Sequence, residues 1–110
     1  MNESDWKLYR KRAPQWRERY LQKRNEVFAT HLNDPQKVPS ERFWEVLEEM
    51  KAEAKILRSL GHHARSNMVF SMVQMLGYGM IAREDITGFS EELQTRLEPY
   101  GRSDSGTSSS

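Results

Sequence analysis

The stretch from Asp5 to Tyr20, DWKLYRKRAPQWRERY, decides the fold because it carries aromatic side chains at helical spacing. Working outward from it, apolar residues recur at alternating steps of three and four, with one step of seven, at Trp6, Tyr9, Ala13, Trp16, Tyr20 and Val27. In an α-helix these steps bring the side chains to one side. The spacing predicts a helix over residues 5–32, capped by Ser4 or Asp5, with its rings turned toward a common core.

Pro14 interrupts this pattern. A proline inside a helix removes a backbone donor and clashes with the preceding turn, and it biases Ala13 away from helical torsions. Two outcomes are open: the helix kinks at Pro14, or a second helix begins with Pro14 at its first position. The second outcome is favoured, and in both cases the two pieces bury the same side.

A second helix is expected from Glu41 to about Leu60. Two prolines and several turn formers in residues 33–40 indicate a loop, Ser40 is placed to cap the helix, and Gly61 to end it. Its predicted apolar stripe consists of Phe43, Leu47, Met50, Ala54 and Leu57, widened by Trp44, Val46 and Leu60.

The most apolar stretch, MVFSMVQML over residues 68–76, predicts a third helix that runs to about Tyr78. Because its apolar side chains point almost all the way round, it should be the central, most buried helix. A last helix is expected from residues 82–85 to Pro99, although Gly88 costs it about 1 kcal/mol relative to alanine. No segment alternates as a half-buried strand does. The fold class is therefore all-α: a compact bundle of three to five helices in one domain, residues 1–100, with a disordered Ser-rich tail, residues 101–110.

Several classes of function are excluded by what the 110 residues lack. There is no cysteine, so disulfides, thiolate zinc sites and cysteine nucleophiles are ruled out. No apolar run is long enough for a membrane span, and no secretory signal is recognisable, so a cytoplasmic protein is expected. His31, His62 and His63 lack metal-ligand spacing, and no catalytic or nucleotide-binding motif is present. The sequence thus predicts no enzyme, no metal and no cofactor.

The charges are divided unevenly along the chain. Residues 1–37 hold nine Lys or Arg against five Asp or Glu, whereas the remainder holds eight against eleven. A nucleic-acid-binding or transcription-regulatory protein is therefore the alternative function, with phosphate contacts from Lys7, Arg10, Lys11, Arg12, Arg17, Arg19, Lys23 and Arg24. Rings that face a core cannot stack on bases, which argues against this alternative.

An acidic row occupies the second helix, where Glu41, Glu45, Glu49 and Glu53 follow at steps of four. Like charges at this spacing repel one another unless a basic element lies alongside. The first helix is one such element. The apolar stripe predicted above turns most of the row away from it, so a solvated face, or a docking strip for a basic partner, is favoured.

Methionines concentrated in the second and third helices suit either an ordinary core or an adaptable binding groove. We hypothesise a non-enzymatic helical protein that acts through protein–protein contacts, with a separate partner or with itself as a homo-oligomer. The contact residues expected for this role are Met68, Met72, Met75, Tyr78 and Met80, with Glu41, Glu45 and Glu49 as the electrostatic alternative.

Overall fold

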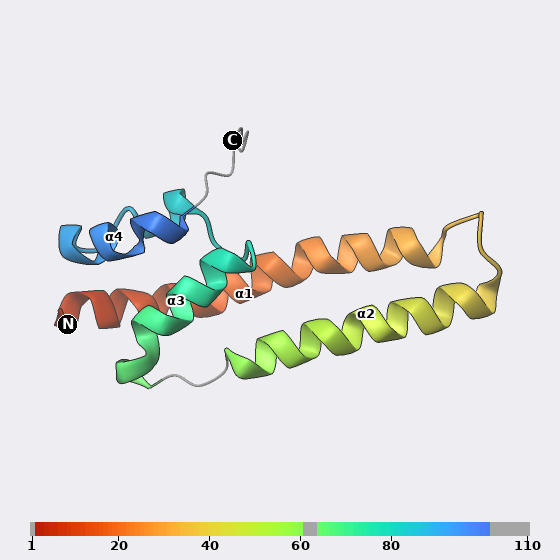
Figure 1. Ribbon diagram of the computed structural model, residues 1–110, viewed down its shortest axis with the longest axis horizontal. Helices are drawn as coiled ribbons and strands as arrows, with labels where there is room; N and C mark the ends of the chain where they lie inside the picture. Colours follow the sequence, from red (N-terminus) through yellow and green to blue (C-terminus); the bar gives the residue numbers. More distant parts are fainter. Residues whose placement is uncertain (1, 61–63, 102–110) are drawn as a thin grey trace. The chain divides into compact units, whose positions relative to one another are not determined.

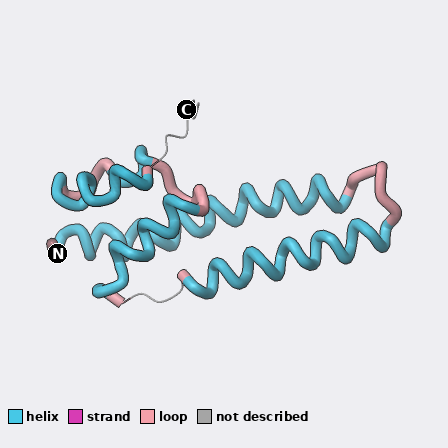
Figure 2. The backbone as a smooth tube through the Cα atoms, in the orientation of Figure 1, coloured by secondary structure: helices cyan, strands magenta, loops and turns pink. Residues whose placement is uncertain are grey.

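The computed structural model describes residues 2–60 and 64–101, and every regular element in them is helical (Figure 1). The order is α1 (Glu3–Leu32), α2 (Pro39–Ser59), α3 (Met68–Gly77) and α4 (Glu91–Leu97), with 3₁₀ turns at Arg65–Asn67, Arg83–Ile86 and Glu98–Tyr100. Figure 2 shows helices and loops and no strand in the described part of the chain. The predicted all-α class is confirmed, and the predicted disordered tail lies, after Gly101, outside the described residues.

The backbone contacts gather into two compact units. The terminal unit comprises Met1–Arg17 and His63–Ser110, and the hairpin unit comprises Glu18–His62. Helix α1 therefore gives its first half to one unit and its second half to the other. The single domain expected over residues 1–100 stays a prediction. Within the described ranges, no helix combines the length and apolarity that crossing a membrane requires.

Helix α1 runs without a break through Pro14, so the favoured start of a second helix at this residue is wrong. The proline ring fixes a φ angle that is already helical, and the cost falls on one missing donor and on the carbonyl of Arg10. Pro14 itself is exposed, while its neighbours Ala13 and Trp16 are buried. Burial on both sides of the proline holds the helix together despite the lost hydrogen bond.

An aromatic chain forms the α1 side of the terminal unit's core. The ring centroids of Trp6 and Tyr9 are 5.9 Å apart, those of Tyr9 and Trp16 are 6.3 Å apart, and Trp16 meets Phe89 at 6.2 Å. The predicted inward orientation is confirmed for Tyr9 and Trp16, which are buried, while Trp6 is half-buried. Around them lie buried apolar side chains from the later elements: Met68, Met72, Met75, Leu76, Ile86, Leu93 and Leu97.

Helix α3 is less enclosed than its composition predicts. Phe70 is 63% exposed, so the helix is not buried on every side. It ends at Gly77, close to the expected end. Gly79 then adopts a φ of 76°, a left-handed conformation that residues with a Cβ atom rarely adopt.

The predicted last helix is three short elements rather than one continuous helix. Helix α4 begins only at Glu91, because the Ser90 hydroxyl caps it by accepting a hydrogen bond from the Leu93 N–H at 3.2 Å. Before this cap, Gly88 lies against Arg12, whose Nη2 would be 2.9 Å from an added Cβ atom. A side chain at this position would therefore displace the guanidinium.

Asp5 links the start of α1 to the start of α4. Its carboxylate is 3% exposed and accepts two hydrogen bonds from Ser90, at 2.8 Å from the backbone N–H and at 2.6 Å from the hydroxyl. The predicted capping role of Ser4 or Asp5 is wrong, because the helix begins earlier and the side-chain oxygen of Asn2 accepts from the Ser4 N–H at 2.8 Å. Asp5 instead orients the residue that caps α4.

Replacing Asp5 by alanine should lower the free energy of unfolding by about 1–3 kcal/mol, because it leaves the partly buried backbone N–H of Ser90 without its acceptor and frees the Ser90 cap. Urea unfolding followed by circular dichroism measures this loss. Glu92→Ala, an exposed carboxylate in α4, is the control and should change stability by less than about 0.5 kcal/mol. Equal losses in the two variants would contradict the role assigned to Asp5.

Burial raises the pKa of the Tyr9 phenol above its ordinary value of 10.0, while the neighbouring Ser71 hydroxyl and the charge of Arg17 lower it by smaller amounts. Because the folded state holds this proton more tightly than the unfolded state, its contribution to stability is complete below pH 10 and is lost as the pH rises further. Tyr9→Phe should therefore reduce the fall in unfolding free energy above pH 10. Denaturant titrations of both proteins at several alkaline pH values test this, and parallel curves would refute it.

Candidate functional site

The methionines predicted to contact a partner lie in the core of the terminal unit. Met68, Met72, Met75 and Met80 are each at most 2% exposed. Tyr78, just after α3, is 43% exposed, so it remains accessible, whereas the four methionines do not. These five residues therefore form no common surface, and the exposed apolar side chains of the molecule have to be sought elsewhere.

The hairpin unit contains the second half of α1 and helix α2, which run antiparallel and are joined by residues 33–38 (Figure 1). Glu53 lies at the centre of the interface between them. Its carboxylate accepts a hydrogen bond from the Tyr20 hydroxyl at 2.6 Å and pairs with Arg24 Nε at 2.9 Å. The Glu53 side chain is only 14% exposed, so this polar cluster is part of the helix–helix contact.

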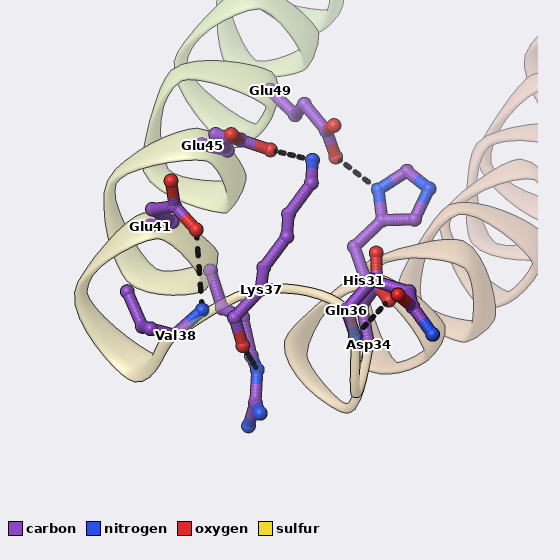
Figure 3. Close-up of polar contacts among 9 residues, drawn as sticks. His31, Asp34, Gln36, Lys37, Val38, Glu41, Glu45 and Glu49 are labelled. Carbon is purple, nitrogen blue, oxygen red and sulfur yellow. Dashed lines mark hydrogen bonds and ion pairs between the residues drawn. The ribbon is translucent and has the colours of Figure 1, made fainter.

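The acidic row continues toward the loop with a partner at each step (Figure 3). Glu49 Oε1 is 2.7 Å from His31 Nδ1, Glu45 pairs with Lys37, and Glu41 Oε1 accepts from the Val38 N–H at 3.2 Å. The bond to Glu45 raises the pKa of the exposed Lys37 ammonium. The solvated face favoured from the sequence therefore holds for Glu41 and Glu45, which are exposed, and is wrong for Glu53, which lies against α1.

The contact that Glu41 makes also changes the expected start of α2. The helix begins at Pro39 with Val38 in the capping position, so the predicted cap at Ser40 is wrong. Proline is favoured at a first helical position because its missing N–H would have no helical partner there. At the other end the helix ends at Ser59, and the predicted terminator, Gly61, lies outside the described residues.

The rotation of α2 about its own axis differs from the predicted one. Its inner side carries Val46, Glu49, Glu53 and Leu60, and both Val46 and Leu60 are buried. The stripe predicted to face the core is displaced around the helix: Phe43 is 55% exposed, Trp44 59% and Met50 43%. The polar cluster at Glu53 is the physical reason, because it places the acidic row against the basic helix.

The displaced stripe meets a matching stripe of α1 on the same side of the hairpin. Leu21 and Phe28 lie three residues before and four residues after Arg24, and Met50 and Leu57 have the same relation to Glu53. At about 100° of rotation per residue, the members of each pair are turned about their own helix axis in the same direction from the ion-paired residue of that helix. In antiparallel helices this puts them on one side. We call this surface the hairpin face; its residues are Leu21, Phe28, Leu32, Phe43, Leu47, Met50, Ala54 and Leu57.

The hairpin face is most exposed near the loop. The rings of Phe43 and Trp44 meet edge to face with centroids 4.8 Å apart, and Leu32, Val38 and Met50 are also exposed. Aromatic side chains and methionine are enriched where proteins contact one another, and a contiguous exposed apolar patch marks such a contact. The face is therefore the candidate functional site. The sequence signal was the 3–4 spacing of the stripe, which was assigned to the core.

The cations considered for nucleic-acid binding are divided between the two units. Lys7, Arg10, Lys11, Arg12 and Arg17 belong to the terminal unit, and Arg19, Lys23 and Arg24 to the hairpin unit. Arg12 lies 5.7 Å from the Phe89 ring and donates to the Asp85 carbonyl at 3.3 Å, and Arg24 lies 5.1 Å from the Phe28 ring. These two guanidiniums are occupied inside their own units, and the burial of Tyr9 and Trp16 removes two stacking surfaces.

Metal ligands do not converge anywhere in the described ranges, where no group of three or more His, Asp or Glu side chains is placed to hold an ion. His31 pairs with Glu49 instead. His62 and His63, which were considered as ligands from the sequence, lie outside the described residues.

Replacing Glu53 by alanine should lower the free energy of unfolding by about 1–3 kcal/mol, because the Tyr20 hydroxyl would lose its acceptor and Arg24 would lose its largely buried ion-pair partner. Glu48→Ala is the matched control on the same helix. Glu48 is 71% exposed and pairs with Lys51 at 3.6 Å, so its loss should cost less than about 0.5 kcal/mol. Chemical denaturation measures both values. Similar small losses in the two variants would contradict the central position of Glu53.

Comparison with known proteins leaves the site to be interpreted from its geometry. The chain matches no protein-family model, no curated protein and no solved structure. No relative therefore supplies a function for the hairpin face.

Proposed function

We propose that the protein acts by binding protein, through the hairpin face, and that it is not an enzyme. The observation that carries the proposal is the exposure of Phe43 and Met50 on the hairpin face, with the exposed Trp44 ring in contact with Phe43 beside it. Exposed apolar side chains at steps of three and four are what a second helix needs for packing ridges into grooves. The cytoplasmic location expected from the sequence is part of the same proposal.

A protein partner fits this surface better than a nucleic acid does. Nucleic acids are held mainly by cations that neutralise phosphates, and by aromatic rings that stack on unpaired bases. The exposed rings, Phe43 and Trp44, lie on α2, whereas the basic cluster predicted to bind phosphates lies on α1. Exposed apolar and aromatic side chains that contact one another favour a partner that buries them, as protein interfaces do.

Of the exposed side chains near the loop end of the hairpin, Phe43 and Trp44 should contribute most to binding. Tryptophan is over-represented among the residues that dominate interface energies, and truncating such a residue typically costs more than about 2 kcal/mol of binding free energy. Trp44 and Phe43 are already in contact with each other, so little ordering remains to be lost when a partner covers them. The loop end of the hairpin is thus the expected centre of the contact.

Site-specific photocrosslinking in the source cells tests the proposal. A photoreactive phenylalanine analogue at Phe43 or at Met50 should form covalent adducts with protein, because these positions lie on the hairpin face. The same analogue at Ala52 is the control. Ala52 is also exposed on α2, but it lies on the other side of the helix from the stripe and should give no adduct of comparable yield.

Two results would contradict the proposal. One is the absence of protein adducts at both positions of the face; the other is an equal yield at Ala52. Adducts to DNA or RNA at Lys7 or Lys11, with none to protein at Phe43, would instead support the nucleic-acid alternative.

A further inference from the structure

The hairpin face needs an occupant, and its own geometry limits what that occupant is. A two-helix hairpin buries one stripe of each helix, and on the hairpin face Leu32, Phe43 and Met50 remain exposed. Helical layers are stable when such stripes are buried against another layer. A second helical hairpin of equal length, with apolar stripes at the same heights, matches the whole face.

From this match, and resting on the proposed function, we infer that a second copy of the chain covers the hairpin face, forming an antiparallel four-helix arrangement. A self-complementary surface satisfies the requirement directly, because two-fold symmetry presents the same stripes to each other. Four antiparallel helices around a shared apolar centre are a recurrent stable architecture. The shared centre would contain the exposed members of the face, Leu32, Phe43 and Met50, beside the half-buried Leu21 and Leu57 from each copy.

The charges at the outer edges of the hairpin favour one of the two possible two-fold axes. Exposed acidic and amide side chains, Glu18, Gln22 and Glu26, follow at steps of four on α1, and Gln22 donates to Glu26 at 3.0 Å. The outer edge of α2 is basic, with exposed Lys51, Lys55 and Arg58. An axis parallel to the helices sets α1 of one copy against α2 of the other, so the acidic edge meets the basic edge.

The heights of these charges agree with that axis. Arg24 and Glu53 are at the same level because they form an ion pair. Glu18 lies six residues before Arg24, and Arg58 lies five residues after Glu53. Because the two helices are antiparallel, both offsets run toward the same end of the hairpin. At about 1.5 Å per residue, the heights of Glu18 and Arg58 along the hairpin differ by less than one helical turn. An axis perpendicular to the helices would instead bring the basic edges of both α2 helices together, where like charges repel. The parallel axis therefore pairs Glu18 of one copy with Arg58 of the other.

Analytical ultracentrifugation of the full chain tests the inference. The protein should sediment as a dimer at about 100 µM, and Met50→Glu should raise the dissociation constant at least about tenfold, since it places a charge in the shared apolar centre. Ala52→Glu introduces the same charge on the other side of α2 and should leave the dimer intact. Circular dichroism establishes that each variant keeps its helices.

A charge reversal tests the axis. Glu18→Lys and Arg58→Glu should each weaken the dimer, and the double variant should regain affinity, because the two residues face each other across the interface. A monomeric wild-type protein, or equal dissociation by Met50→Glu and Ala52→Glu, would overturn the dimer; additive losses in the double variant would overturn this arrangement of it.

The crosslinking described above separates failure of the dimer from failure of the proposed function. Adducts at Phe43 with a different protein, from a chain that is monomeric in the centrifuge, would reject the second copy and leave protein binding standing. A monomer that also forms no protein adduct would reject both.

Discussion

The carboxylate of Glu53, held between the Tyr20 hydroxyl and Arg24, fixes the rotation of α2 on α1. A charged group that is only 14% exposed keeps its charge favourably only when it is paired and hydrogen-bonded, so α2 is not free to turn Glu53 outward without leaving Arg24 behind. Everything on the outside of the hairpin follows from this rotation. Val46 and Leu60 are turned in, and Phe43, Trp44 and Met50 are turned out.

The uneven charge distribution of the chain has a local explanation for the same reason. The acidic row of α2 meets His31, Lys37 and Arg24, all supplied by the first 37 residues. Cations that neutralise carboxylates within the hairpin unit contribute less to the field that attracts an external polyanion. In the terminal unit, Arg12 is held in a similar way between the Phe89 ring and a backbone carbonyl. The basic N-terminal third is thus partly a structural requirement of the fold.

How much the sequence predicts depends on which physical effect decides each feature. The all-α class, the loop after Leu32 and the inward rings of Tyr9 and Trp16 follow from apolar spacing, which dominates where burial is uncontested. The helix continues through Pro14, contrary to the local preference of proline for a helix start, because Ala13 and Trp16 on either side of it are buried. For α2, apolar spacing correctly predicts that Val46 and Leu60 are turned inward, but it does not predict that Phe43, Trp44 and Met50 are exposed. The inward position of Glu53 depends on its contacts with Arg24 and Tyr20, which are 29 and 33 residues away in the sequence, so no local pattern predicts it.

This conflict between pattern and structure is itself informative about function. A helix of a self-sufficient domain gains stability by burying its most apolar stripe and exposing its charges, and natural sequences are usually consistent in this respect. Helix α2 departs from this in part: Val46 and Leu60 are buried, but Glu53 is turned inward while Phe43 and Met50 are exposed. An arrangement that leaves apolar area in water is unfavourable for an isolated chain, at about 25 cal/mol for each Å² left exposed. The same arrangement becomes favourable once another helical surface covers the stripe, because the polar cluster then holds the hairpin in the rotation that presents it.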